Sequence, residues 1–316
     1  MNFKKPVFWD YKKPNFLSYL LLPFTLFIRL NNFLLNFKKE NYNKKIKTIC
    51  VGNIYIGGTG KTPTTIKIYN ILKKLKISTV IGKKEYESQI DEVRVIKNYA
   101  KIIVDKSRIR ILKKAKTNKY KVLIFDDGLQ DKNICYDLQI VCFDSINTIG
   151  NGFLIPAGPL REKLKSLSKY DCVLIKDSNG DIKKITKAVK KINNKIKIFI
   201  TNFRIKNLNE FKTSKKYLIF SGIGNPKTFK NILLKNRIKV VKEFNFPDHY
   251  SYKKSDIIKI KKIATKMNLE IITTEKDYVK ISKSDQKKIK YLKVELNFKK
   301  EKNFINYLKS KINEKN

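Results

Sequence analysis

Residues 48–76 read TICVGNIYIGGTGKTPTTIKIYNILKKLK, and this stretch decides the fold. Its first four residues form a short apolar run that is typical of a buried strand. A glycine-rich turn follows. Beyond the turn, apolar side chains recur at helical spacing, at Ile66, Tyr69, Leu72 and Leu75. Pro63 suits the first turn of that helix, where a missing N–H is harmless. The stretch therefore predicts a strand, a tight loop and a helix over residues 63–76.

A loop in this position favours phosphate binding, because successive backbone N–H groups and the helix N-terminus face a bound anion. The residues expected to contact a nucleotide are Tyr55, Ile56, Gly57, Gly58, Thr59, Gly60, Lys61 and Thr62. In that arrangement Lys61 reaches the β- and γ-phosphates, and the Thr62 hydroxyl binds Mg²⁺. The strict phosphate-loop motif, G-x-x-x-x-G-K-T, has glycine at the position of Tyr55. The competing interpretation is a glycine-rich turn that only begins a helix.

A pair of carboxylates ends another apolar run downstream. Residues 122–125 read VLIF, and Asp126, Asp127 and Gly128 follow them. Acidic side chains at the end of such a strand commonly hold Mg²⁺ directly or through water. An Asp-Gly pair is also an ordinary turn signal. Considered together with the phosphate loop, the acidic pair predicts that Asp126 is the metal ligand and that Asp127 has a supporting role at the metal site.

The rest of the chain alternates between strand and helix patterns, which indicates an α/β protein with a mostly parallel sheet. Further strands are expected at residues 78–81, 102–104, 138–143, 172–175, 196–200, 217–220, 240–244 and 271–273. Further helices are expected at residues 226–235 and 254–267, and the charged tail 299–316 is expected to form a final helix. The Gly- and Pro-rich loop 150–159 suggests a boundary. We therefore expect a P-loop domain at 41–150 and a smaller second α/β domain at 151–316.

The N-terminal segment, residues 16–37, reads FLSYLLLPFTLFIRLNNFLLNF and has almost no polar face. Its most apolar part, residues 20–28, is too short to cross a bilayer, which needs about 20 apolar residues. Lysines flank the segment on both sides. An apolar body with basic flanks favours a helix in the membrane interface, held by burial and by anionic lipid. The alternative is a helix packed on the protein's own core. Residues 1–40 are expected to form this membrane-associated element.

The composition excludes some classes of site and leaves others open. Lys and Arg total 71 against 27 acidic residues, a formal charge of +44. Such a charge indicates an anionic partner, whether nucleic acid, an acidic membrane or a phosphorylated substrate. The competing explanation is compositional drift, since Lys, Asn and Ile are abundant and Gly numbers only 12. The four cysteines form no C-x-x-C pair and only one histidine exists, so a zinc site is not expected.

Taken together, the motifs resemble the tetraacyldisaccharide 4'-kinase family over nearly the whole chain. The matching stretches are VGN at 51–53, GGTGKTP at 57–63, DDGLQ at 126–130, GNG at 150–152, LIPAGPLRE at 154–162, SGIG at 221–224, FPDH at 246–249 and TTEKD at 273–277. The loop at 154–162 is not a general feature of P-loop proteins. This combination is therefore quite specific.

The resemblance implies a two-lobed, ATP- and Mg²⁺-dependent enzyme on the cytoplasmic face of the bacterial inner membrane, held there peripherally or monotopically by its N-terminal helix. The family transfers the γ-phosphate of ATP to the 4'-hydroxyl of a tetraacylated glucosamine disaccharide 1-phosphate, a step of lipid A biosynthesis. The implied partners are this glycolipid and anionic inner-membrane lipid. Neither nucleic acid nor an obligate protein partner is expected.

The resemblance also implies roles for individual residues. Asp91 matches a catalytic acid of the family that accepts the hydroxyl proton, and His249 matches the histidine that orients or polarises it. On spacing alone, a single histidine is more often structural. Arg161 matches an arginine of the Pro-rich loop, and Arg108 one that precedes the strand ending at Asp126. Both arginines are expected, with Lys61, to neutralise phosphate charge in the transition state.

The chain departs from the family pattern around its catalytic acid. The family's Ser-Arg-Gly-Tyr stretch is replaced by IGKKEY at 81–86, in a segment shortened before Asp91. Ile90 occupies the position of a family glycine, and Val93 that of a family proline. Asp131 occupies the position of the histidine that usually follows Asp-Asp-Gly-x-Gln. The residues of the nucleotide loop are untouched by these changes.

Two other functions fit part of the pattern. A nucleic-acid-associated P-loop ATPase would use the positive charge, but it gives no reason for the apolar segment 20–28. A membrane GTPase would need an Asn-Lys-x-Asp guanine motif. The chain has only a partial match to this motif, TEKD at 274–277. The kinase hypothesis explains the phosphate loop, the membrane segment, the basic surface and His249 together.

Overall fold

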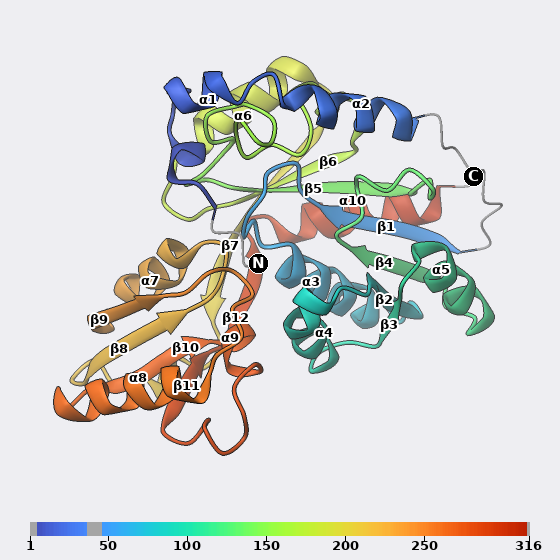
Figure 1. Cartoon of the computed structure of the whole chain (residues 1–316). Helices are drawn as coiled ribbons and strands as arrows, with labels where there is room; N and C mark the ends of the chain where they lie inside the picture. The colour runs from blue at the N-terminus through green and yellow to red at the C-terminus, as the bar shows by residue number, and fades with distance from the viewer. Residues whose placement is uncertain (1–4, 37–45, 315–316) are drawn as a thin grey trace. The chain divides into compact units, whose positions relative to one another are not determined.

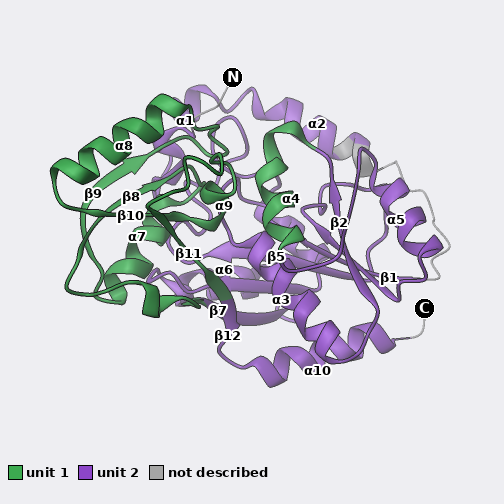
Figure 2. Ribbon diagram, turned by 90° about the horizontal axis from the view of Figure 1, so that it is seen from below, with its two compact units in different colours: residues 1–4, 86–98, 203–295 green, residues 5–85, 99–202, 296–316 purple. Residues whose placement is uncertain are grey.

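The structure, a computed structural model, describes residues 5–36 and 46–314. These residues form two compact units, coloured separately in Figure 2. Among the described residues, the large unit comprises 5–36, 46–85, 99–202 and 296–314, and the small unit comprises 86–98 and 203–295. Each unit is therefore assembled from segments that are far apart in the sequence.

The large unit is built on an eight-stranded sheet (Figure 1) with the order β12-β7-β6-β5-β1-β4-β2-β3. The strands are β1 (Lys47–Gly52), β2 (Thr79–Lys84), β3 (Ile102–Asp105), β4 (Val122–Asp126), β5 (Leu138–Asp144), β6 (Cys172–Lys176), β7 (Lys197–Ile205) and β12 (Val294–Phe298). Every pairing from β3 across to β7 is parallel. The predicted mostly parallel sheet is confirmed, and β1 and β4 are direct neighbours in it.

Helices cover this sheet because its central strands are apolar on both faces. The helices of the large unit are α1 (Phe16–Leu20), α2 (Thr25–Asn36), α3 (Lys61–Lys74), α5 (Arg108–Thr117), α6 (Ile182–Ile192) and α10 (Glu301–Asn313). Short 3₁₀ turns lie at Val7–Asp10 and Leu164–Lys169. Helix α3 packs against β1, β2 and β4, and α5 packs against β2 and β3.

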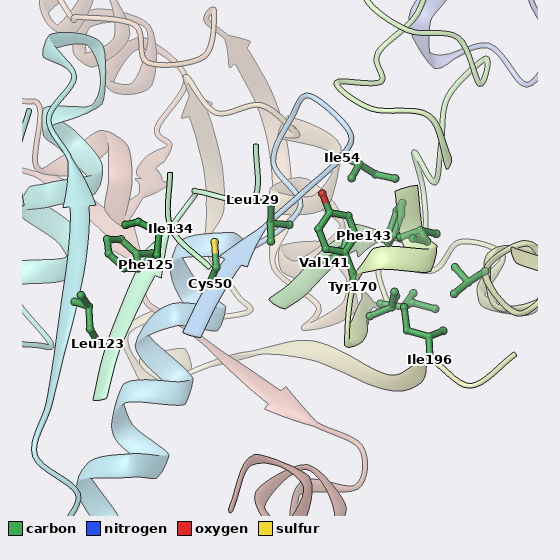
Figure 3. Close-up of a cluster of buried hydrophobic side chains, with 14 of the residues drawn as sticks. Cys50, Ile54, Leu123, Phe125, Leu129, Ile134, Val141, Phe143, Tyr170 and Ile196 are labelled. Atoms are coloured by element: carbon green, nitrogen blue, oxygen red, sulfur yellow. The ribbon is translucent and has the colours of Figure 1, made fainter. Parts of the chain in front are cut away.

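The main core of the large unit lies between the sheet and these helices (Figure 3). Cys50, Phe125, Val141 and Phe143 come from three neighbouring strands and are all buried there. Cys172 is also buried. This core fixes β1 and β4, so the loops that follow these two strands start from rigid positions.

The small unit has its own sheet, with the order β11-β10-β8-β9 and only parallel pairings. Its strands are β8 (Lys216–Ser221), β9 (Lys239–Asn245), β10 (Glu270–Thr274) and β11 (Ile289–Leu292). Its helices are α4 (Ile90–Lys97), α7 (Pro226–Lys235), α8 (Lys254–Lys266) and α9 (Glu275–Tyr278), with 3₁₀ turns at Glu87–Gln89 and Leu208–Glu210. Separate apolar clusters lie on the two faces of this sheet. The predicted second, smaller α/β unit is present.

The units do not follow the boundary expected near residue 150. Strands β6 and β7 come after that residue, yet they share a sheet with β1. Helix α4 comes before it, yet it belongs to the small unit. Strand order in a parallel sheet depends on long-range pairing, which a linear pattern of strands and helices does not encode.

The N-terminal segment folds into two short helices, α1 and α2, with an interruption around Pro23. Apolar side chains along both helices are exposed, among them Phe16 at 79% and Phe27 at 72%. Other large apolar residues exposed on this segment are Leu17, Tyr19, Leu20, Phe24, Leu26, Leu30 and Leu34. Within residues 5–36 and 46–314, no helix has both the length and the apolar character that crossing a membrane requires. Part of the basic flank, residues 38–39, lies outside the described residues.

Candidate active site

The phosphate loop joins the end of β1 to the start of α3, as the sequence predicts. Gly57 has φ 138° and Gly60 has φ 87°, both in the region that favours glycine. The Asn53 amide donates to the Gly57 carbonyl at 3.3 Å and to Thr59 Oγ1 at 3.1 Å. These contacts shape the loop locally, and Lys61 and Thr62 open the helix that follows. The arrangement has the form of an anion site at a helix N-terminus.

The first two residues of the predicted nucleotide loop, Tyr55 and Ile56, contact the N-terminal segment and the Pro-rich loop. The Tyr55 side chain is buried, and its hydroxyl accepts from Lys5 at 2.7 Å and donates to Asp10. Burial, followed by the hydrogen bond to Asp10, raises the pKa of Tyr55 well above its usual range. The backbone N–H of Ile56 donates to the Pro159 carbonyl. In this structure these contacts attach the start of the loop to the N-terminal segment and to the Pro-rich loop.

Asp126, the last residue of β4, lies in a buried polar cluster at the start of α3. Thr62 Oγ1 donates to Asp126 Oδ2 at 3.1 Å, and Thr65 Oγ1 donates to Asp126 Oδ1 at 3.2 Å. Lys83 Nζ, from β2, lies 2.9 Å from Asp126 Oδ2. The side chains of Lys83 and Asp126 are 1% and 0% exposed, so the ion pair is fully buried. Lys83 was not predicted from the sequence, although a lysine that interrupts an apolar strand is a recognisable signal.

Asp127 lies at the turn after β4, with φ 62°. Its backbone N–H donates to the Val51 carbonyl, which anchors the turn beside the end of β1. Its carboxylate is 3.6 Å from Lys61 Nζ and 3.2 Å from the Arg161 guanidinium. Two of the predicted site residues, Lys61 and Arg161, thus both contact the carboxylate of a third, Asp127.

Arg108 supports the same turn from the start of α5. Its guanidinium donates to Asp131 at 2.8 Å and to the Asp127 carbonyl. Asp131 stands where the family has a histidine, and here it fixes the direction of Arg108. Gln130 continues the network, because its amide donates to the Asn53 carbonyl and to Glu162. The loops after β1 and β4 and the Pro-rich loop are therefore joined by hydrogen bonds.

A second buried ion pair flanks the phosphate loop. Lys176, the last residue of β6, lies 2.7 Å from Asp144, the last residue of β5. Lys176 Nζ also donates to the Gly58 carbonyl at 3.5 Å. Ser178 donates to Asp144 as well. Lys176 was not predicted from the sequence, although it ends an apolar strand in the way that Asp126 does.

The residues present fit a nucleotide with Mg²⁺. The loop provides N–H groups at a helix N-terminus and an adjacent lysine, which suits phosphate. Thr62 and Asp126 place a hydroxyl and a carboxylate side by side, and these are hard oxygen donors of the kind that Mg²⁺ prefers. Mg²⁺ usually keeps waters and substrate phosphates as its other ligands, so a large protein cage is not required.

In the small unit, Asp91 and His249 form a contact across 158 positions of sequence. Asp91 lies in the first turn of α4, and His249 lies in the loop after β9 with φ 59°. His249 Nδ1 is 3.1 Å from Asp91 Oδ1 and 3.2 Å from Oδ2. Burial acts to raise the pKa of Asp91, but the hydrogen bond from His249 and the charge of Lys276 outweigh it, so the pKa is lowered. The carboxylate is therefore ionised near neutral pH.

Two lysines lie beside this pair, and neither was predicted as a site residue from the sequence. Lys276, in α9, lies 3.2 Å from His249 Nε2 and 3.1 Å from Glu92 Oε1. Lys280 Nζ lies 3.8 Å from Asp91 and 2.7 Å from Asp277. Lys276 lies in the TTEKD stretch at 273–277, which matched the family. The position of Lys276 in that stretch did not indicate that it would contact His249. The predicted site residues thus form two groups, the nucleotide group in the large unit and Asp91 with His249 in the small one.

Known proteins resemble this chain over most of its length. A family model described as tetraacyldisaccharide-1-P 4'-kinase matches residues 15–313. The chain is 46% identical over 316 residues to the tetraacyldisaccharide 4'-kinase of Pelagibacter ubique, with 100% of each chain covered. It is 36% identical over 293 residues to the enzyme of the same name from Rickettsia canadensis, with 87% of each covered.

Among solved structures, the fold is similar to that of LpxK from Aquifex aeolicus, crystallised in complex with ATP. The TM-score is 0.68 at 20% identity, covering 94% of this chain and 99% of that one. The match therefore extends to both units of the fold. The family match over residues 15–313 and the 46% identity to the Pelagibacter ubique enzyme show that this chain belongs to the tetraacyldisaccharide-1-P 4'-kinase family.

Proposed function

We propose that this chain transfers the γ-phosphate of ATP to the 4'-hydroxyl of a tetraacyl glucosamine disaccharide 1-phosphate in lipid A biosynthesis. The observation that carries the proposal is the contact between Thr62 and Asp126 beside the glycine loop, which supplies two oxygen ligands for Mg²⁺ next to a phosphate-binding loop. Membership of the family defines the acceptor. Phosphoryl transfer depends mainly on positioning and charge stabilisation, and these residues supply both.

On the nucleotide side, the loop N–H groups and Lys61 bind the β- and γ-phosphates, and Arg161 adds positive charge beside them. Lys61 and Arg161 both contact Asp127, so this carboxylate keeps the two cations in place before ATP arrives. Arg108 holds the Asp127 turn through its carbonyl. Thr62 and Asp126 would hold Mg²⁺, which supplies positive charge to the phosphate oxygens.

On the acceptor side, Asp91 takes the proton of the 4'-hydroxyl while the oxygen bonds to the γ-phosphorus. The bond between the γ-phosphorus and the bridging oxygen breaks, and ADP leaves with that electron pair. His249 orients the Asp91 carboxylate through Nδ1. Because the pKa of Asp91 is lowered, the base is deprotonated before the acceptor binds.

The exposed apolar side chains of α1 and α2 support attachment to the membrane that contains the acceptor. A set of such residues on one short segment is more than a soluble surface ordinarily exposes. Burial in the interface region of a lipid bilayer, assisted by the positive charge of the chain, would stabilise it there. We propose peripheral attachment to the cytoplasmic face of the inner membrane.

The formal charge of +44 also favours a second candidate, a P-loop ATPase associated with nucleic acid. That function predicts ATP turnover that DNA or RNA stimulates and that salt suppresses. It gives no role to the contact between Asp91 and His249. The two candidates therefore differ in the acceptor that consumes ATP.

The test is a transfer assay with purified chain in detergent, Mg²⁺ and ATP labelled at the γ-phosphate. The disaccharide 1-phosphate is expected to become labelled, and Lys61→Ala should lower the rate by about 10²–10³-fold, a loss typical of a removed charge stabiliser. Unlabelled lipid together with ATP turnover driven by DNA or RNA would favour the second candidate instead.

A further inference from the structure

Lys276 has a contact for each of the three protons on its ammonium group. Its Nζ lies 3.1 Å from Glu92 Oε1, 3.4 Å from Asp248 Oδ1 and 3.2 Å from His249 Nε2. An ammonium group has three donors and no acceptor. Two of its partners are carboxylates, which only accept when ionised, and the third is a ring nitrogen of the chain's single histidine.

This contact determines where the histidine proton lies. The charges of Glu92, Asp248 and Asp91 keep Lys276 protonated by raising its pKa, although burial, the largest single influence, acts in the opposite direction. A protonated Lys276 can only donate to Nε2, so Nε2 must carry a lone pair. The one remaining ring proton then lies on Nδ1, which faces the Asp91 carboxylate at 3.1 Å.

We propose that Lys276 is a positioning residue that fixes His249 as the neutral tautomer with its proton on Nδ1, so that Asp91 and not His249 receives the proton of the acceptor. With its lone pair engaged by Lys276, Nε2 cannot serve as a competing base. The Nδ1–H group is committed to Asp91 and holds its carboxylate in one orientation. The kinetic part of this inference rests on the proposed function, whereas the tautomer does not.

The charges around His249 predict what happens without Lys276. Asp91 and Glu92 face the ring from α4, with Glu92 3.8 Å from Nε2, and Asp248 lies 3.9 Å from Nε2 in the same loop. The positive charges nearby are Lys276 and Lys280, and Lys280 is paired with Asp277. In Lys276→Met, three carboxylates surround the ring and one cation near it is lost. Without the ammonium donor, Nε2 faces only carboxylate acceptors among these groups, so we expect it to carry a proton.

Imidazole ¹⁵N NMR tests the tautomer directly, because His249 is the only histidine and gives one pair of ring nitrogens. In the full wild-type chain at about pH 7.5, Nδ1 should show the shift of a protonated nitrogen and Nε2 that of an unprotonated one. A proton on Nε2 in the wild type would overturn the proposal. This measurement needs no variant and no activity.

Lys276→Met should show a protonated Nε2 under the same conditions, because its donor is gone and carboxylates remain beside it. Lys280→Met is the matched control, because it removes a cation 3.8 Å from Asp91 that makes no contact with Nε2 among the described residues. Its histidine signals should keep the wild-type pattern. If Lys280→Met changed the signals as Lys276→Met does, general charge and not the Nε2 contact would be responsible, and the proposal would fail.

In the transfer assay, Lys276→Met should lower kcat by about 10²-fold near neutral pH, the scale of a misplaced general base, and leave KM for ATP unchanged. The loss should accompany a protonated Nε2 in the NMR spectrum of the same variant. A similar loss with the wild-type tautomer intact would contradict the positioning role. If the wild type itself transferred no phosphate, the proposed function would fail while the NMR result would still decide the tautomer.

Discussion

Thr62 at the start of α3 and Asp126 at the end of β4 lie in hydrogen-bond contact, with 3.1 Å between Oγ1 and Oδ2. The contact exists because β1 and β4 are neighbours in a parallel sheet, so their carboxyl ends reach the same edge. The loop after β1 then delivers the threonine to the aspartate. A hydroxyl and a carboxylate meet at the place where a nucleotide's phosphates would lie.

Asp126→Asn should raise the Mg²⁺ concentration needed for half-maximal transfer by about 10-fold or more, because it removes a charged metal ligand. The measurement is a Mg²⁺ titration of the transfer rate at saturating ATP. Asp181→Asn is the control, since asparagine still caps the start of α6. An unchanged Mg²⁺ requirement in Asp126→Asn would argue against this carboxylate as a ligand.

Lys83→Met should destabilise the fold, because it leaves the buried Asp126 carboxylate without its cation. Loss of one member of a buried pair costs about 3–5 kcal/mol of unfolding free energy. Urea unfolding of the two proteins measures the difference. The exposed Lys74 of α3 provides the comparison, and Lys74→Met should stay within about 0.5 kcal/mol of the wild type. Equal stability of Lys83→Met and wild type would show that the pair is not stabilising.

Asp91 should make stability depend on pH in the acid range. Its pKa in the folded chain lies below the ordinary value of 3.8, so its contribution is complete above that value. As pH falls below 3.8 through the folded pKa, the carboxylate is protonated and the contribution is lost. Urea unfolding from neutral pH to about pH 3 should therefore show a smaller loss for Asp91→Asn than for the wild type. Identical pH profiles would mean that Asp91 gains nothing from His249 and Lys276.

Lys176→Met should weaken ATP binding, because Lys176 Nζ holds the Gly58 carbonyl of the phosphate loop. We expect KM for ATP to rise about 10-fold, the effect of about 1.4 kcal/mol of lost binding. Lys187→Met, an exposed change on the neighbouring helix α6, should leave KM unchanged. Should both variants bind ATP as the wild type does, the Lys176–Asp144 pair would have a structural role only.

The N-terminal helices should carry the membrane affinity. The double variant Phe16→Ser, Phe27→Ser removes two of the most exposed apolar side chains of α1 and α2. It should bind anionic phospholipid vesicles at least about 10-fold more weakly in a sedimentation assay, since burying each phenylalanine contributes about 1.5–3 kcal/mol. Ile258→Ser, which changes an exposed apolar residue of α8, is the control. Equal losses in both proteins would contradict an N-terminal attachment site.

Local patterns predicted the elements that sequence alone can specify. Helix α7 occupies the expected residues 226–235, since Asn225 caps it and Pro226 begins it. The helix expected at 63–76 is observed at Lys61–Lys74, because the helical conformation already begins at the lysine and threonine of the loop. Both elements carry strong start signals within a few residues of sequence.

Long-range relationships could not be predicted in the same way. The buried contacts of Lys83 and Lys176 depend on which strands are neighbours, and strand order is set by pairing across the whole chain. Helix α4 was missed because it has only 8 residues, too few for an apolar repeat to be recognised. The contact between Asp91 and His249 spans 158 positions, and only the family resemblance suggested it.

The position of the new phosphate on the product tests the central claim most directly. The product of wild-type chain, ATP, Mg²⁺ and the tetraacyl disaccharide 1-phosphate would be isolated and studied by ³¹P and ¹H NMR. A second phosphate ester coupled to the proton on carbon 4' is the predicted result. Release of inorganic phosphate beside an unmodified disaccharide, or an ester at another hydroxyl, would contradict it.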